Sequence, residues 1–304
     1  MLRFKLLGTA AGGGFPQWNC ACSLCECARL DPLAVPPRLH LQALVSSGSS
    51  EQFLINASPD LKFQIESQPA LSPVSGITTR NSPIAGIVLT SADLDQCLGL
   101  LLLREFQPLR VYATALVRRA LETNSFFRML RRIPDQLTWI EIVPGESFPL
   151  GESIRCTPVS LPASLPFYAS DLASDPSDIA AQANVGLVLT SGKSRIAFTP
   201  SLPTITRDLF DLYSTCDLIL VDGTFWSDDE LSRTQPGTPR AHEIGHLPIS
   251  GTDGTLAQLR HLTRPTKHFV HINNTNPVLD PRSPEHRMVR EAGWQIPLDG
   301  WQWD

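Results

Sequence analysis

The chain has 304 residues, of which 42% are hydrophobic and 18% are charged, and its formal net charge is -5. This composition fits a globular protein with a sizeable core and excludes wholesale disorder. No block of Lys and Arg is present, so nucleic acid is not expected as a partner. The longest aliphatic stretch, residues 98–103, is far shorter than the roughly 20 residues that span a bilayer, so no membrane span is expected.

Apolar and β-branched runs predict strands, and amphipathic runs predict helices. The strands are expected at residues 3–7, 40–45, 52–55, 84–89, 110–112, 186–189, 195–198, 218–221 and 268–272. The helices are expected at residues 95–106, 115–131, 206–213 and 255–262. Strands interleaved with helices indicate an α/β or layered α+β fold. No repeat and no change of composition marks a linker, so residues 1–304 are expected to form one domain.

The N-terminal segment and the cysteine usage bear on the compartment. Arg3 and Lys5 precede a short apolar run, but Gly12-Gly13-Gly14 follows at once. We therefore expect a first strand and a tight turn rather than a signal peptide. Four of the seven cysteines lie close together and the other three are isolated, which fits a reducing cytoplasm better than a secreted disulfide scaffold.

The cysteine cluster has the spacing of a metal site. Cys20, Cys22 and Cys25 form a Cys-x-Cys-x-x-Cys pattern, and thiolates so spaced can converge on one Zn²⁺ with a fourth ligand from elsewhere. A closed zinc site would hold the loop at about residues 19–27 together, so its expected role is structural. The alternative is a group of buried or redox-active thiols. Cys27 is expected to be either a spare or a substitute ligand.

The segment after the strand at 84–89 carries polar side chains where α/β proteins place their chemistry. It resembles the metal loop of metallo-β-lactamase-fold hydrolases, whose order is Thr-His-x-His-x-Asp-His. Here Ser91 and Asp93 take the first two His positions, Asp95 keeps the Asp, and Gln96 takes the last His position. Asp93 and Asp95 either bind a metal or cap the helix that follows.

That loop lacks the imidazoles that a dinuclear zinc hydrolase needs. The position of the bridging Asp in that fold also reads differently, as Ala197-Phe198-Thr199-Pro200. A standard hydrolytic dinuclear site is therefore not expected.

Two histidines and one aspartate later in the chain are further candidates for the site. His271 and Asp222 lie at the ends of predicted strands, and His246 lies in a loop. His271 ends an apolar strand and is followed by hydrogen-bonding side chains, which favours a ligand or substrate contact. His246 lies in a Gly- and Pro-rich loop, and Asp222 ends the strand at 218–221, where it either supplies a carboxylate or fixes a turn. Together, Asp95, His246 and His271 would form a two-His, one-carboxylate set, which suits mononuclear non-haem iron.

Longer segments carry a resemblance that covers the whole chain. Their residues are 8–22, 56–60, 98–105, 221–226, 245–247, 271–277 and 283–285. On these segments the chain resembles the PqqB family of pyrroloquinoline quinone (PQQ) biosynthesis proteins. Gln96 departs from the family pattern, which has His at that position.

The resemblance implies a metallo-β-lactamase fold, which is an α+β four-layer αββα sandwich. It also implies a structural zinc on Cys20, Cys22 and Cys25, and Asn274 is our candidate for the fourth contact. The implied activity is a cytoplasmic, iron(II)-dependent hydroxylation of the tyrosine ring in a crosslinked Glu–Tyr precursor. The catalytic iron is then expected on Asp95, His246 and His271.

Neighbouring polar residues complete the expected site, in contact with the substrate or in support of the metal ligands. They are Asp93, Gln96, Asp222, Asn273 and Asn276. The expected partners are a small-molecule or short peptide-derived precursor and other PQQ-pathway proteins. Two alternatives remain open, namely a non-catalytic protein that binds or transports PQQ or its precursor, and a zinc-dependent hydrolase of the same fold.

Overall fold

The computed structural model describes residues 2–48, 51–105, 107–172 and 175–304. These residues form two units. The first unit comprises Met1–Leu7, Leu41–Lys193 and Gly300–Asp304, and the second comprises Gly8–His40 and Ser194–Asp299. The single domain expected over residues 1–304 stays a prediction. Within the described ranges, none of the helices combines the length and the apolar character needed to cross a membrane.

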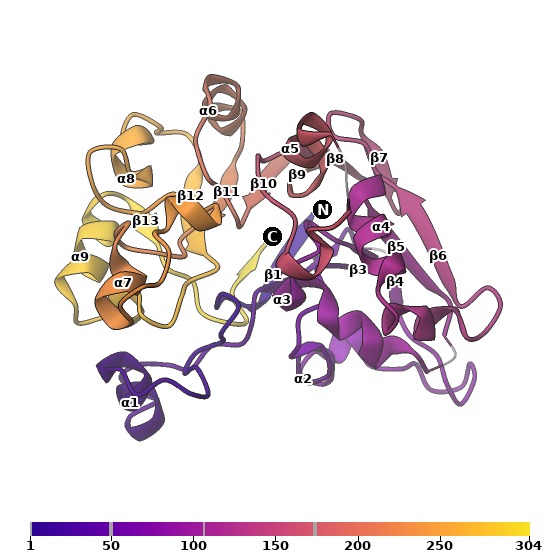
Figure 1. The fold of residues 1–304 in the computed structure, drawn as a ribbon. Helices are drawn as coiled ribbons and strands as arrows, with labels where there is room; N and C mark the ends of the chain where they lie inside the picture. The colour runs from indigo at the N-terminus through magenta and orange to yellow at the C-terminus, as the bar shows by residue number, and fades with distance from the viewer. Residues whose placement is uncertain (1, 49–50, 106, 173–174) are drawn as a thin grey trace. The chain divides into compact units, whose positions relative to one another are not determined.

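The first unit is built around a mixed sheet. Its strands, in spatial order, are β14 (Gln302–Trp303), β1 (Arg3–Gly8), β2 (Gln42–Ser46), β3 (Gln52–Ile55), β4 (Ile84–Val88), β5 (Leu109–Ala113) and β6 (Leu137–Glu141). β1 pairs antiparallel with β14, and β2 with β3, whereas β3 to β6 run parallel. The pairing of β1 with β14 brings the first and last strands of the chain together (Figure 1).

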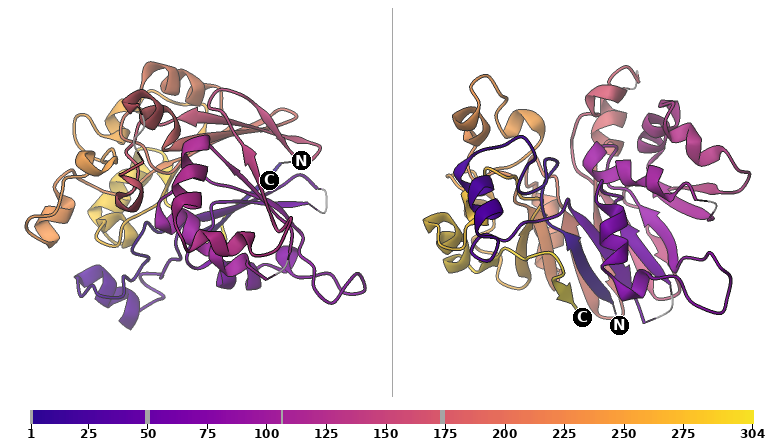
Figure 2. Two further views of the ribbon diagram at one scale, coloured as in Figure 1. Left: turned by 45° about the vertical axis from the view of Figure 1, so that its right-hand side comes forward. Right: turned by 90° about the horizontal axis from the view of Figure 1, so that it is seen from below.

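Helices cover one face of this sheet (Figures 1 and 2). They are α2 (Leu61–Glu66), η1 (Pro69–Leu71), α3 (Leu94–Cys97), η2 (Leu98–Leu103), α4 (Ala115–Thr123) and η3 (Phe127–Arg131). The apolar core beneath them takes Leu54, Ile87 and Val111 from the strands, and Leu100 and Val117 from the helices. Alternate strand residues face this core because successive side chains of a strand point to opposite faces.

A second, antiparallel set of strands lies in the same unit. It comprises β7 (Phe148–Leu150), β8 (Ile154–Ser160) and β9 (Val185–Ser191), paired in chain order. Between β8 and β9 lie η4 (Phe167–Ala169) and α5 (Pro176–Gln182). The ring of Tyr112 in β5 stacks on that of Phe148 in β7, with centroids 5.3 Å apart. This contact packs the second set of strands on the first sheet.

The second unit contains a parallel set of strands. They are β10 (Ser194–Thr199), β11 (Leu218–Asp222), β12 (Thr266–Val270) and β13 (Trp294–Gln295). The other elements of the unit are α1 (Ser23–Leu30), α6 (Arg207–Ser214), α7 (Glu230–Thr234), η5 (His242–Ile244), α8 (Thr255–Gln258), η6 (Pro277–Leu279) and α9 (Pro284–Glu291). Because β11 and β12 run parallel, their carboxyl ends lie at the same edge, and this edge carries Asp222 and His271.

Several predicted elements need correction. The helix expected at 95–106 is α-helical only over Leu94–Cys97 and continues as a 3₁₀ helix over Leu98–Leu103. The reason lies at Gly99, whose N–H donates to Ala57 O at 2.8 Å and whose missing Cβ would lie 2.2 Å from Ser58 O. This close approach of two backbones pulls the chain out of the α-helical path.

Two further helix predictions were also too long, whereas the helix expected at 206–213 matches α6. The helix expected at 115–131 is interrupted at Asn124, where the backbone is extended, and the one expected at 255–262 ends at Gln258. The zinc-binding loop expected at 19–27 is wrong in its second half, since α1 begins at Ser23.

The 3₁₀ helix η2 offers a matched pair for testing the core. Leu100 is fully buried, whereas Leu102 is 44% exposed. We expect Leu100→Ala to lower the free energy of unfolding by about 2–5 kcal/mol, because the substitution removes apolar contacts and leaves a cavity. Leu102→Ala should cost less than about 1 kcal/mol. Equal losses for both variants in urea denaturation would contradict this packing.

Candidate metal centres

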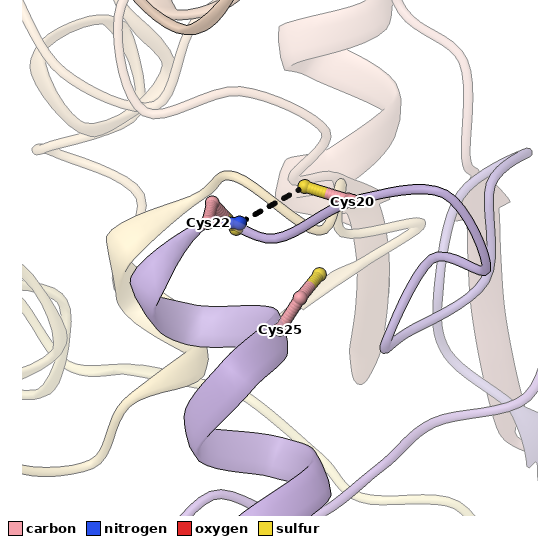
Figure 3. A group of neighbouring side chains, drawn as sticks. All are labelled: Cys20, Cys22 and Cys25. Atoms are coloured by element: carbon pink, nitrogen blue, oxygen red, sulfur yellow. Dashed lines mark hydrogen bonds between the residues drawn. The ribbon is translucent and has the colours of Figure 1, made fainter.

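Three cysteine sulfur atoms converge in the second unit. Cys20 and Cys22 precede α1, and Cys25 lies in its first turn. The three sulfur atoms all lie within 4.8 Å of one another, and Figure 3 shows the side chain of Cys25 directed from the helix toward Cys20. The N–H of Cys22 donates to Cys20 Sγ at 3.5 Å. The three sulfur atoms of the Cys-x-Cys-x-x-Cys pattern are thus close enough to share one ion.

Asn274 lies directly beside this cluster and is 4% exposed. Its side-chain nitrogen donates to Cys25 Sγ at 3.4 Å, and its backbone oxygen accepts from Cys22 Sγ at 3.9 Å. Rotation of the amide by half a turn would place its oxygen at the sulfur atoms instead. The three sulfurs fit three of the four positions of a tetrahedral zinc site, and the amide oxygen is the nearby candidate for the fourth.

Cys27 stands apart from this group, although it belongs to the same helix. Its sulfur accepts a hydrogen bond from Arg282 at 3.5 Å. The group within mutual reach therefore consists of three cysteines, not four.

The thiols of Cys20 and Cys22 differ in pKa because their surroundings differ. Burial alone would raise the pKa of Cys20, but hydrogen bonds from Cys22, Cys25 and Asn274 outweigh it and hold this pKa below its usual value. Burial raises the pKa of Cys22 to about 11. Since zinc binds thiolates, Cys22 must lose a proton when a metal enters, and metal affinity should rise with pH.

A second group of potential ligands lies at the carboxyl edge of β11 and β12. Asp222, His246 and His271 each offer an atom within 4.8 Å of the others. The two imidazole rings stack with centroids 5.4 Å apart and an interplanar angle of 24°. Asp222 is fully buried and His271 is 6% exposed. Of the expected ligand set, the structure thus brings His246 and His271 together.

The carboxylate of Asp222 accepts hydrogen bonds on both oxygens. Oδ1 accepts from the backbone N–H and the hydroxyl of Thr224, at 2.9 and 2.6 Å. Oδ2 accepts from the N–H of Leu202 at 2.8 Å and lies 2.7 Å from His246 Nδ1. A carboxylate has about four lone-pair sites, so these contacts use its acceptor capacity. Asp222 therefore orients His246, as carboxylates commonly orient metal-binding histidines.

The backbone around His271 is held in an unusual conformation. His271 has φ 58°, in the left-handed region that costs a non-glycine residue about 1–2 kcal/mol. The segment after it is fastened to Thr224, whose carbonyl accepts from the N–H of Asn273 at 3.0 Å and from the amide of Asn276 at 3.3 Å. Asn273 and Asn276 thus support the histidine through the backbone.

The predicted metal loop of the first unit forms its own hydrogen-bond network. Gln96 is 1% exposed. Its side-chain oxygen accepts from the hydroxyl of Thr90 and lies 3.2 Å from Ser91 Oγ. Ser91 Oγ in turn donates to Asp93 Oδ2 at 2.7 Å. Gln96 therefore stabilises the loop, and its oxygen is engaged where a histidine would offer a ligand nitrogen.

Asp95 lies in α3 of the first unit, whereas both histidines lie in the second. Its role as an iron ligand stays a prediction. The segment expected at the place of the usual bridging Asp, residues 197–200, contains no carboxylate, and within it the hydroxyl of Thr199 bonds to Tyr213 Oη at 2.6 Å. That position offers no carboxylate for a dinuclear site.

One buried acid near the cysteine cluster was not predicted from sequence. Glu230 is 6% exposed and accepts hydrogen bonds from Thr275 Oγ1 and Trp226 N, both at 2.6 Å. Burial raises its pKa to about 7, despite these hydrogen bonds. Because the folded protein holds this proton more tightly than the unfolded chain, the contribution of Glu230 to stability is greatest below about pH 4.5 and is lost as the pH rises through about 7.

We expect Glu230→Gln to remove this pH dependence. The variant should gain stability relative to the parent protein between pH 5 and 8, by on the order of 3 kcal/mol at most. Glu291→Gln, an exposed glutamate at the end of α9, is the matched control and should change nothing. Urea denaturation at pH 5 and at pH 8 measures the effect. If the free energy of unfolding of parent and variant differed by the same amount at the two pH values, the assignment would be contradicted.

Comparisons with known proteins agree on the fold. A family model described as "Beta-lactamase superfamily domain" matches residues 51–272. The crystal structure of Zn²⁺-bound PqqB from Methylobacterium extorquens superposes with a TM-score of 0.90, at 36% identity, over 99% of both chains. A diphosphatase of the PhnP family has a TM-score of 0.66 at 18% identity, over 100% of this chain and 98% of the other, which shows the fold alone. The predicted metallo-β-lactamase fold is thus confirmed.

The curated relatives define the family more closely. Coenzyme PQQ synthesis protein B from Gluconacetobacter diazotrophicus is 38% identical over 99% of this chain and 98% of its own length. Its counterpart from a Methylobacterium species is 37% identical over 97% of each chain. The chain therefore belongs to the PqqB family of coenzyme PQQ synthesis proteins.

Proposed function

We propose that this chain is an iron(II)-dependent hydroxylase that acts on the tyrosine ring of a crosslinked Glu–Tyr precursor in PQQ biosynthesis. Family membership supports the pathway. The observation that carries the chemistry is the stacked pair of imidazoles of His246, which is partly buried, and His271, which is buried, each hydrogen-bonded at Nδ1 by the chain itself. Such a pair supplies the two nitrogen donors of a mononuclear iron site.

In this proposal, some residues of the second unit bind the iron and others orient the residues that bind it. His246 and His271 would hold the iron, and Asp222 and Thr224 orient them. When bound, ferrous iron supplies the activation of dioxygen that ring hydroxylation needs. Phe225 packs its ring edge-on against His246, with centroids 5.7 Å apart, and so keeps water from one side of the imidazole.

We further propose that Cys20, Cys22 and Cys25 hold a structural zinc, with Asn274 as the fourth contact. The solved relative from M. extorquens is described as Zn²⁺-bound. The three converging sulfur atoms and the amide beside them fit that metal. Our proposal places the protein in the cytoplasm, with a small-molecule or short peptide-derived precursor and other PQQ-pathway proteins as partners.

The hydroxylase proposal predicts a product heavier by one oxygen atom. Protein loaded anaerobically with ferrous iron would be mixed with a tyrosine-bearing precursor and ascorbate and then exposed to air, with mass spectrometry as the readout. His271→Ala should abolish the product, because it removes a nitrogen donor. His261→Ala, which changes an exposed histidine of the same unit, should leave it intact. No oxygen incorporation with the unaltered protein would refute the proposal.

A second candidate function is non-catalytic binding or transport of PQQ or its precursor. The engagement of Gln96 by Thr90 and Ser91 favours it, because the loop then offers one metal ligand fewer than the family pattern. This function predicts tight binding of the precursor without turnover, whether or not iron is present. Calorimetric titration beside the mass assay distinguishes the two functions.

The zinc proposal predicts one zinc per chain in the purified protein. Cys25→Ser should lower zinc affinity by at least about 100-fold, more than the loss of an outer hydrogen-bond partner costs. Cys27→Ser is the control in the same helix, and it should retain full zinc because Cys27 lies outside the group. Elemental analysis after dialysis measures both, and full zinc in Cys25→Ser would disprove the assignment.

A further inference from the structure

One hydroxyl group lies among all three side chains of the histidine–aspartate group. Thr224 follows β11 and is 2% exposed. Its Oγ1 lies 2.6 Å from Asp222 Oδ1, 2.8 Å from His271 Nδ1 and 3.1 Å from His246 Nδ1.

The count of protons fixes the direction of these hydrogen bonds. The carboxylate of Asp222 only accepts, so the hydroxyl of Thr224 donates its one proton to Asp222 Oδ1. Thr224 Oγ1 can then only accept from His271, which places a proton on His271 Nδ1. His246 Nδ1 faces Asp222 Oδ2 at 2.7 Å, so it also carries a proton. In a neutral imidazole the other nitrogen, Nε2, then holds the lone pair.

We infer that Thr224 is a positioning residue that fixes His271 in the Nδ1-protonated form and aligns it with His246. Both histidines then present Nε2, the unprotonated nitrogen, for a divalent transition metal. This inference deepens the proposed function and rests on it for the identity of the metal. The tautomers themselves follow from the chain's own hydrogen bonds.

The backbone of Thr224 is held firmly enough for this role. Gly223 donates to Val270 O at 2.8 Å, and a Cβ at Gly223 would lie 2.8 Å from Phe269 Cβ. Only glycine therefore lets the turn approach β12 so closely. The carbonyl of Thr224 accepts from Asn273 and Asn276, so the hydroxyl and His271 are parts of one connected segment.

The two histidines should respond differently when the hydroxyl is removed. In Thr224→Val, His271 Nδ1 loses its hydrogen bond to the hydroxyl, whereas His246 Nδ1 keeps Asp222. His271 should change to the Nε2-protonated form or to a mixture, and His246 should stay as it is. His246 thus serves as the control within the same molecule.

Long-range proton–nitrogen NMR of ¹⁵N-histidine-labelled, zinc-loaded protein reads each tautomer directly, because the two ring nitrogens of histidine are distinct. Ferrous iron titration gives the second readout, and Thr224→Val should weaken iron binding by about 10–100-fold. Thr224→Ser retains the hydroxyl and should restore both properties. Thr255→Val removes another fully buried threonine hydroxyl of the same unit and should change neither.

The outcomes distinguish the positioning role of Thr224 from the proposed function. If the tautomer of His271 and the iron affinity are unchanged in Thr224→Val, Thr224 has no positioning role. If the unaltered protein shows Nε2 protonation on both histidines, the hydrogen-bond assignment is wrong. If the tautomers are as assigned but the protein does not bind iron, the proposed function fails and the positioning role stands. Thr224→Ala replaces the valine variant if the latter does not fold.

Discussion

The arrangement of side chains at the carboxyl edge of β11 and β12 depends on one buried carboxylate. Asp222 is fully buried at the end of β11, and an unpaired charge there would be very costly. Here the two oxygens are hydrogen-bonded to two backbone N–H groups, one hydroxyl and one imidazole, which stabilise the charge. The same hydrogen bonds that stabilise the charge also set the orientation of His246 and, through Thr224, that of His271. One network therefore both stabilises the buried charge and orients the two histidines.

The segment from His271 to Asn276 connects this network to the cysteine cluster. His271 contacts Thr224 near one end, and Asn274 contacts Cys25 and Cys22 further along. Thr275 is held between them by the buried Glu230. A metal at the cysteines would fix Asn274 and so restrict the backbone that carries His271. The cysteine cluster and the histidine pair are thus joined by a short stretch of chain, within one unit.

Sequence patterns predicted strands that are short apolar runs, such as Gln52–Ile55, whose bounds match β3. They missed β8, because Pro158 lies inside it and proline usually argues against a paired strand. They also missed α9, although Ser283 caps it and Pro284 takes its first position, which is a recognised start signal. The break at Gly99 was not predictable, since it depends on contact with a distant backbone segment.

The residues of the candidate sites were likewise predictable from the sequence only in part. The cysteine spacing was sufficient to predict three converging sulfurs, because the ligands are close in sequence. The pairing of His246 with His271 was proposed from their positions at strand ends and in a polar loop. The role of Thr224 left no signal, since a threonine after Asp-Gly reads as an ordinary turn. Its importance comes from a hydroxyl position that only the folded chain defines.

Anomalous X-ray diffraction from crystals grown with zinc and then soaked anaerobically in ferrous iron tests the account most directly. Data collected at the zinc and iron absorption edges would locate each metal separately. The account predicts a zinc peak among Cys20, Cys22 and Cys25, and an iron peak beside the Nε2 atoms of His246 and His271. A histidine pair without any metal peak, or iron found only at the cysteines, would contradict it.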